Sequence, residues 1–374
     1  MNLDLQYLLF LQNNVRTDNL TPFMMGVSNF AISFGLMAAI FCIFWCVDKK
    51  SGYFMITSYC ITSLINSLVK LSFCIYRPWI RDPHIVPAGD AIKSAGGYSF
   101  PSGHTQIITA SFASGAVLTW MKQKWFSILL FIIIFTVAFS RNYLGVHTPQ
   151  DVIVGFILGL LSVIWAYKLQ NREKKDKKSD FKLLLYGIII GIVSILYYTY
   201  KNYPTSFDSE GKLIVDPIRM MKDGFLSTGL WMGFLLGWFI EKYYINFTTN
   251  CSVPIKLARA VFGVGSLYLV YFKIGRLFYQ LMSNCWANFF KWFLMIFYVM
   301  AIYPLIFKFV ENLILSQQDE TMEQFKTDEQ GEAEGQGESE GQYETDEQGE
   351  TDERDKIVQK DKKLLISQDI STNK

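Results

Sequence analysis

Residues 140–169 have the sequence SRNYLGVHTPQDVIVGFILGLLSVIWAYKL. The second part of this stretch, residues 152–169, is almost wholly apolar and approaches the roughly 20 residues that a helix needs to cross about 30 Å of hydrocarbon. Thr148 followed by Pro149 is typical of a helix N-terminus, because threonine caps the first turn and proline suits its first position. The stretch therefore predicts a membrane-spanning helix that begins directly after a polar segment containing His147.

Similar apolar runs recur along the chain. Its 374 residues are 51% hydrophobic and only 18% charged, which is too apolar for one soluble core of this size. We therefore expect an all-α membrane protein, a polytopic transmembrane helix bundle of about nine spans. The expected spans are residues 26–46, 53–76, 104–120, 125–140, 152–169, 182–200, 224–241, 257–273 and 284–308.

Charge divides the chain into regions. A dense basic linker lies between two groups of spans, and the chain beyond about residue 317 is rich in Glu, Gln and Gly and lacks the apolar residues needed to fold. For this tail we expect solvation without a specific partner, with a basic partner as the alternative. The expected regions are an interfacial N-terminal segment (1–25), a membrane core (26–169), a basic cytoplasmic linker (170–181), an additional membrane region (182–311) and a disordered acidic cytoplasmic tail (312–374).

The basic residues of the short loops predict the orientation. If the spans alternate, these residues fall on one side of the membrane, which the positive-inside rule identifies as the cytoplasm. Segments 77–103 and 141–151 then lie on the extracytoplasmic side, and all 3 histidines of the chain lie between residues 77 and 151. The basic residues are Lys49, Lys50, Lys122, Lys124, the cluster at 168–182, Lys242, Lys256 and Arg259.

Glycines spaced four residues apart recur within the expected spans, and such pairs allow close helix approach in lipid. Packing within one bundle is the simpler interpretation, and a homo-oligomer is the alternative. The pairs are Gly155 with Gly159, Gly187 with Gly191, and Gly233 with Gly237.

The first of three polar blocks is KLSFCIYRP, residues 70–78. A continuous helix would place Lys70 and Arg77 about 20° apart on one face, with Lys70 about 10 Å deeper. A lysine within an apolar run costs about 2.5 to 3.5 kcal/mol at mid-membrane, so it either snorkels to the interface or serves a function.

The second block is FPSGH, residues 100–104. Ser102 is a natural N-cap and Gly103 permits close backbone approach to a ligand, so the start of this helix offers N–H groups to an anion. His104 follows directly and is placed to transfer a proton beside that anion.

The third block is SRNYLGVHTPQD, residues 140–151. His147 stands four residues before Asp151, so the carboxylate can accept the imidazole N–H and fix which ring nitrogen is free to attack. The alternative is that Asp151 only stabilises the helix dipole.

Together the blocks have the composition of a phosphate site. Phosphoryl transfer spreads negative charge over the equatorial oxygens and needs fixed donors and cations, with attacking and leaving groups in line. Lys70, Arg77 and Arg141 supply positive charge against the roughly 1.5 to 2 negative charges of a phosphomonoester. His147 and His104 are expected at opposite ends of the in-line axis, as nucleophile and general acid.

The patterns K-x6-R-P, P-S-G-H and S-R-x5-H-x3-D occur in this order between residues 70 and 151. They resemble the signature blocks of the type 2 phosphatidic acid phosphatase family, which shares its site with bacterial acid phosphatases and vanadium haloperoxidases. The resemblance implies that His147 forms a phosphohistidine, Asp151 orients it and His104 protonates the leaving group. It also implies a phosphate site that uses no metal ion or other cofactor and consists of Lys70, Arg77, Ser102, Gly103 and Arg141.

The expected function is hydrolysis of a lipid phosphate or polyisoprenyl pyrophosphate at the extracytoplasmic face of the cell membrane. The alternatives are a phosphotransferase that passes the group to an alcohol and a non-catalytic lipid-binding membrane module. The expected partners are the membrane and a phosphorylated lipid, and no nucleic acid. Residues 182–311 lie outside the resemblance, and the loop 201–223 either covers the site or only connects two spans.

Overall fold

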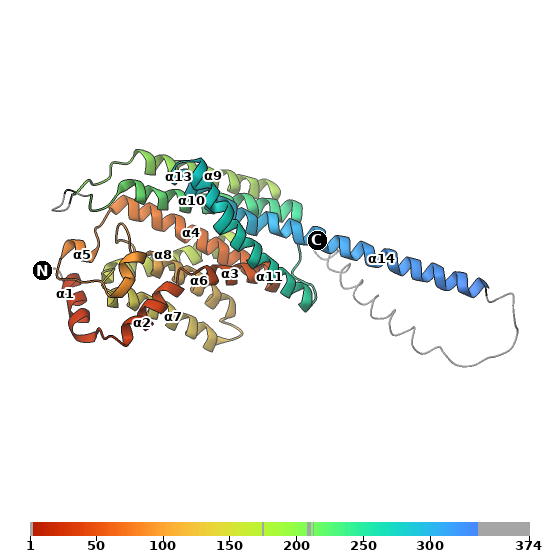
Figure 1. Ribbon diagram of the computed structural model, residues 1–374, viewed down its shortest axis with the longest axis horizontal. Coiled ribbons are helices and arrows are strands. Elements are labelled where there is room, and N and C mark those ends of the chain that lie inside the picture. Colours follow the sequence, from red (N-terminus) through yellow and green to blue (C-terminus); the bar gives the residue numbers. More distant parts are fainter. Residues whose placement is uncertain (1–2, 174–175, 208–210, 212, 336–374) are drawn as a thin grey trace. The chain divides into compact units, whose positions relative to one another are not determined.

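The computed structural model describes residues 3–173, 176–207, 211 and 213–335 and consists almost entirely of helices in this part of the chain (Figure 1). The all-α class predicted from the apolar runs is therefore confirmed. The α-helices are α1 (Leu3–Phe10), α2 (Leu20–Phe30), α3 (Phe34–Cys42), α4 (Lys49–Phe73), α5 (Pro78–Arg81), α6 (Gly103–Thr119), α7 (Lys124–Tyr143), α8 (Pro149–Gln170), α9 (Lys177–Tyr200), α10 (Pro217–Ile240), α11 (Val253–Leu269), α12 (Gly275–Leu281), α13 (Asn284–Phe297) and α14 (Tyr303–Gly335).

The number of spans is lower than the sequence predicted. Among the described residues, 7 helical segments are long and apolar enough to cross a membrane, and the pair Leu20–Phe30 and Phe34–Val47, bent by 43°, raises this number to 8. The remaining predicted span, 104–120, corresponds to α6, which has 17 residues. At about 1.5 Å per residue this helix is at the short end of the range for a membrane span.

Helix α6 lies among α4, α7 and α8 and is polar for a membrane helix. Thr105, Gln106 and Thr109 are fully buried. Gln106 Nε2 donates to Thr62 O at 3.0 Å, and Thr109 Oγ1 donates to Thr105 O at 2.7 Å. Because neighbouring helices surround α6, these two side chains find partners within the protein.

The glycine pairs allow close contacts between helices of this chain. A Cβ added to Gly155 of α8 would lie 2.8 Å from Ser102 O, and one added to Gly159 would lie 2.9 Å from Gln106 O. These contacts bring α8 directly against α6, as expected for packing within the bundle. The other pairs have the same arrangement, with Gly187 and Gly191 facing α10, and Gly233 and Gly237 facing α13 and the turn after it.

The loops predicted to be cytoplasmic meet at one end of the bundle. Lys49 Nζ lies 2.6 Å from Glu241 Oε1, which links the start of α4 to the turn after α10. Arg172 and Lys242 both form ion pairs with Asp180 at the same end. These contacts agree with the alternation of spans on which the orientation was based.

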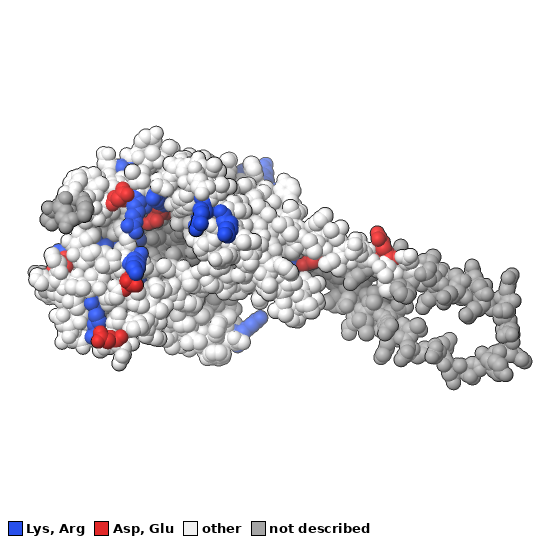
Figure 2. All heavy atoms as spheres, in the orientation of Figure 1, with Lys and Arg blue, Asp and Glu red and all other residues white. Residues whose placement is uncertain are grey.

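The segments predicted to be extracytoplasmic meet at the other end, where α1 covers them. Asp4 Oδ2 pairs with Arg81 Nη1 at 3.0 Å, and Leu5 and Leu8 pack beside Ile85. Figure 2 shows a face on which charged side chains gather mainly towards the end where Figure 1 places α1 and α5, while most of the remaining surface is uncharged.

Helical structure extends beyond the boundary predicted at residue 312. Helix α14 continues to Gly335, and its acidic part contains good helix formers such as Gln, Glu and Met. The rest of the predicted tail, residues 336–374, lies outside the described part of the chain.

We expect Gly155→Ala to lower the thermal unfolding temperature, because its Cβ would force α8 away from Ser102 O. Such overpacking typically costs about 1–3 kcal/mol. Gly265→Ala is the matched control, since nothing lies within 4 Å of a Cβ at that position. Thermal unfolding in one detergent compares the two variants, and equal unfolding temperatures would contradict the tight α6–α8 contact.

Candidate active site

Residues 144–148 join α7 to α8, and this turn carries His147. Gly145 adopts a φ of +72°, the left-handed conformation that favours glycine at the end of a helix. Thr148 caps α8, and its N–H donates to Asp151 Oδ2 at 2.8 Å. The predicted start of α8 is confirmed, and it fixes His147 relative to Asp151.

Asp151 and Arg77 hold the two ring nitrogens of His147. Asp151 Oδ2 lies 3.3 Å from His147 Nδ1 and also accepts a hydrogen bond from Ser99 Oγ at 2.5 Å. Arg77 Nη1 lies 2.8 Å from Nε2, and because a guanidinium only donates, Nε2 is the acceptor. The network therefore assigns the imidazole proton to Nδ1 and leaves the lone pair on Nε2.

Ser99 belongs to this network although none of the sequence blocks contains it. It is 1% exposed, and its N–H donates to Ile75 O at 2.7 Å. Only its position in the predicted outer segment could have indicated a role. The spacing of residues along the chain does not show which serine will contact the Asp151 carboxylate.

Arg77 lies in a different element from the one that the sequence predicted. Helix α4 ends at Phe73, and Cys74 adopts a left-handed φ of 51°. Arg77 therefore lies in the extended segment before α5, with a ψ of 153°. The prediction of one continuous helix face shared by Lys70 and Arg77 was wrong, because α4 ends while the apolar sequence continues.

Backbone carbonyl groups hold the Arg77 side chain, which is 3% exposed. Its guanidinium donates to Val146 O at 2.9 Å, to Gly97 O at 3.2 Å and to Gly96 O at 3.3 Å. Two separate segments thus fix its direction towards His147.

Lys70 lies in the last turn of α4 and lines a cavity of about 160 Å³ between α4, α6 and α10. Its ammonium forms no hydrogen bond or ion pair with the described residues, so it is available to a ligand. The other lining residues are Ser63, Asn66, Ser67, Leu71, Ile107, Asp223 and Leu226.

Arg141, in the last turn of α7, is fully buried. Its Nη1 donates to Ser28 Oγ, whereas Nε and Nη2 have no hydrogen-bond partner in the described part of the structure. A buried guanidinium with open donors is unfavourable without an anion, so these nitrogens fit a phosphate oxygen.

The start of α6 carries the remaining predicted residues. Ser102 caps the helix by accepting from Thr105 N at 3.4 Å, and its own N–H donates to Asp151 O at 2.9 Å. Gly103 and His104 occupy the first turn, where backbone N–H groups have no helical acceptor. His104 Nε2 is buried and has no hydrogen-bond partner among the described residues, so it is free to exchange a proton with a ligand.

The cations converge on His147. Burial lowers the pKa of His147 well below its ordinary value, and the positive charges of Arg77, Arg141 and Lys70 lower this pKa further. The imidazole is therefore neutral in the absence of an anion, as a nucleophile must be.

His84, the third histidine of the outer segments, lies outside this network. Its side chain is 85% exposed, and its Nδ1 lies 2.8 Å from Asp82 Oδ1. It thus has no contact with the buried histidine and aspartate.

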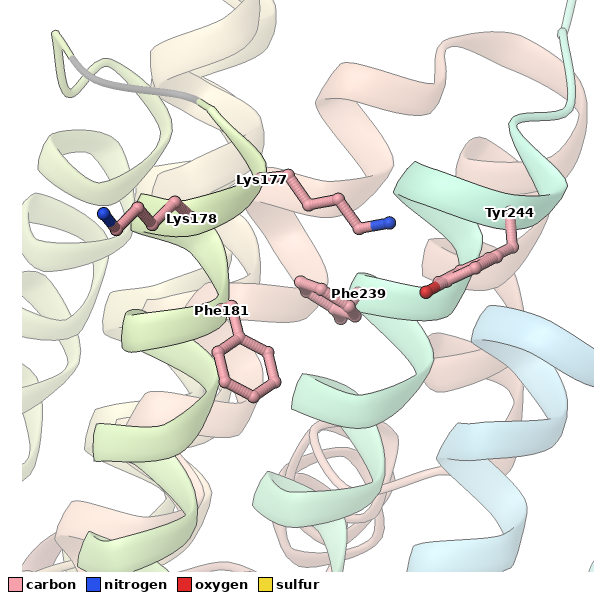
Figure 3. A pocket seen from close by; sticks show the side chains of 5 residues that line it. All are labelled: Lys177, Lys178, Phe181, Phe239 and Tyr244. Carbon is pink, nitrogen blue, oxygen red and sulfur yellow. The ribbon is translucent and has the colours of Figure 1, made fainter.

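A second cavity, of about 490 Å³, lies at the opposite end of α10 (Figure 3). Phe239, one of its lining residues, follows Asp223 by about 24 Å along the helix. Lysines and aromatic side chains line this cavity, and no histidine or carboxylate does, so it is not part of the candidate active site. The lining residues are Lys177, Lys178, Phe181, Phe239 and Tyr244.

Fold and site together define a membrane protein with a buried, cation-rich anion site around a histidine and an aspartate. Residues 51–175 match the model of the PAP2 superfamily, and residues 225–314 match that of the PAP2 superfamily phosphatase, transmembrane extension. The chain belongs to the PAP2 superfamily and is an integral membrane protein with multiple spans.

Curated relatives agree with this assignment. The chain is 34% identical over 112 residues to an undecaprenyl-diphosphatase of Sulfolobus acidocaldarius, covering 30% of this chain and 51% of that protein. It is 29% identical over 120 residues to a lipid A 4'-phosphatase of Bacteroides thetaiotaomicron, covering 29% of this chain and 52% of that protein. The chain thus spans about half the length of these relatives.

The similarity to YbjG of Escherichia coli K12 is 38% identity over 137 residues, covering 32% of this chain and 67% of that protein. No solved structure matches the chain.

We expect kcat/KM to decrease with falling pH only below pH 6.5, which is about the ordinary pKa of histidine. The pKa of His147 is lowered, so its imidazole stays neutral as the pH falls through that ordinary value and is protonated only at lower pH. The pH profile should be measured with two substrates whose phosphate groups ionise at different pH, which separates the enzyme's titration from the substrate's. An acid limb above pH 6.5 with both substrates would contradict this prediction.

Proposed function

We propose that the chain is a metal-independent phosphatase that hydrolyses a lipid phosphate or polyisoprenyl pyrophosphate through a phosphohistidine intermediate. The observation that carries this proposal is the arrangement around His147, whose Nδ1 faces Asp151 while its Nε2 faces Arg77. An imidazole held in this tautomer has its nucleophilic lone pair at the point where a cation would hold a phosphate oxygen.

In the first step, the phosphate takes up the open donors of the site. Arg141 Nε and Nη2, the Lys70 ammonium and the N–H groups at the start of α6 surround the phosphoryl oxygens. Arg77 Nη1 now points at Nε2, so it must turn from the ring nitrogen to a phosphoryl oxygen before attack. Substrate binding thereby exposes the nucleophile.

Nε2 of His147 then forms a bond to phosphorus as the bond from phosphorus to the leaving oxygen breaks. His104 gives its proton to that oxygen, while the proton on Nδ1 of His147 stays beside Asp151, whose charge stabilises the modified ring. In the second step, His104 takes a proton from water, the water oxygen bonds to phosphorus, and the N–P bond breaks. Inorganic phosphate and the original imidazole result.

Three observations support the proposed location of the site, the lipid substrate and the metal independence. The basic loops favour an extracytoplasmic site in the cell membrane. The names of the relatives describe phosphatases of undecaprenyl diphosphate and lipid A, which favours a lipid substrate. Buried Arg77 and Arg141 and the Lys70 ammonium supply the positive charge that a metal ion provides in other phosphatases.

We expect His147→Ala to lower phosphate release by about 1000-fold or more, because removal of a nucleophile eliminates the covalent route. His84→Ala is the matched control, since that side chain is 85% exposed and remote from the network. Purified proteins should be tested on phosphatidic acid, phosphatidylglycerol phosphate, a sphingoid phosphate and a polyisoprenyl pyrophosphate.

Equal rates for His147→Ala and the parent protein would exclude His147 as the nucleophile. If no substrate were hydrolysed by either protein, a lipid-binding module would be favoured. If substrate loss exceeded released phosphate in the presence of an alcohol, the chain would be a phosphotransferase.

We expect EDTA to leave the activity unchanged. We expect vanadate to inhibit competitively, because vanadate adopts the five-coordinate geometry of the phosphorus in the transition state. Initial rates at several substrate concentrations measure both effects. Activity that EDTA abolishes and magnesium restores would refute metal independence.

A further inference from the structure

The first turns of α10 pack against the loop that holds Arg77. A Cβ on Gly96 would lie 2.6 Å from Arg219 Nη2, and one on Gly97 would lie 2.0 Å from Met220 Cε. The carbonyl oxygens of these two glycines are acceptors of the Arg77 guanidinium. Helix α10, which belongs to the membrane region of open role, therefore supports a residue of the candidate active site.

One turn further along α10, Asp223 faces the cavity that contains Lys70. The Asp223 side chain is exposed to this space, and its backbone oxygen accepts a hydrogen bond from Ser67 Oγ at 3.2 Å, which ties α10 to α4. Within the described part of the chain, the Asp223 carboxylate has no hydrogen bond or ion pair. It is an acceptor that faces a cavity which it shares with the Lys70 ammonium, whose positive charge acts on it.

The cavity reaches the start of α6. Asn66 lines it, and Asn66 Oδ1 would lie 3.4 Å from a Cβ on Gly103. Ile107, also in the lining, follows His104 by one helical turn and so shares its face of α6. The space therefore lies beside the residue that is expected to protonate the leaving group.

The size and lining of the cavity indicate what it accepts. A volume of about 160 Å³ corresponds to about five water molecules, so a few non-hydrogen atoms fit and a lipid tail does not. A carboxylate acceptor favours a group that donates a hydrogen bond.

We propose that Asp223 forms a subsite for a hydroxyl or amino group that the substrate carries next to the scissile phosphate. This inference rests on the proposed phosphatase function. It gives the membrane region 182–311 a role in substrate selection, through a residue on α10. The segment 201–223, expected to be a loop that covers the site or connects spans, thus ends in this helix.

The test compares two substrates on the purified full-length protein. A sphingoid phosphate carries an amino and a hydroxyl group beside the phosphate, and phosphatidic acid carries neither. We expect Asp223→Asn to lower kcat/KM for the sphingoid phosphate about ten-fold or more, because a charge-assisted hydrogen bond is lost. For phosphatidic acid we expect a change of less than about three-fold, which also shows that the variant is folded.

Two further variants sharpen the comparison. Asp223→Ala should lower the sphingoid rate at least as far as Asp223→Asn, because no acceptor remains. Asp90→Asn removes the same charge from an exposed outer residue that pairs with Lys93, so it should leave the substrate ratio unchanged.

Equal losses with both substrates, or no loss with either, would overturn the subsite while leaving the phosphatase function intact. A parent protein that hydrolyses neither substrate, nor any other lipid phosphate, would overturn the proposed function and the subsite with it.

Discussion

The buried carboxylate of Asp151 is the group on which the outer end of the structure depends. Its Oδ2 accepts from Ser99 Oγ and Thr148 N and lies against His147, and its backbone oxygen accepts from Ser102 N. Hydrogen bonds to a charged group contribute about 1.5 to 3 kcal/mol each. The Asp151 carboxylate thus stabilises the first turn of α8 and orients the imidazole, and the Asp151 backbone oxygen anchors the start of α6.

Much of the arrangement around Asp151 could be predicted, because the residues that form it are close to one another in the sequence. The cap at Thr148, the spacing from His147 to Asp151 and the start of α6 all follow from neighbouring residues, and the structure has each of them. Whether these residues catalyse the proposed reaction stays a prediction. The apolar runs likewise predicted the helical class, and α6 is slightly shorter than the helices that are long and apolar enough to cross a membrane.

Features that depend on distant residues or on a single backbone angle were not predicted. Nothing in the apolar sequence around Cys74 indicates a left-handed residue, yet it removes Arg77 from the helix of Lys70. The contribution of Ser99 and the approach of α10 to the Arg77 loop require segments that are far apart in the chain. Such contacts are specified by tertiary packing, for which a single sequence has no periodic signal.

The open donors of Arg141 have a consequence for turnover. Buried positive charge without a counter-ion destabilises the empty site, so any tetrahedral dianion that enters relieves that penalty. Inorganic phosphate presents the same oxygens as the esterified group and lacks only the lipid. In the proposed reaction, the donors that hold the esterified group therefore also hold the released phosphate.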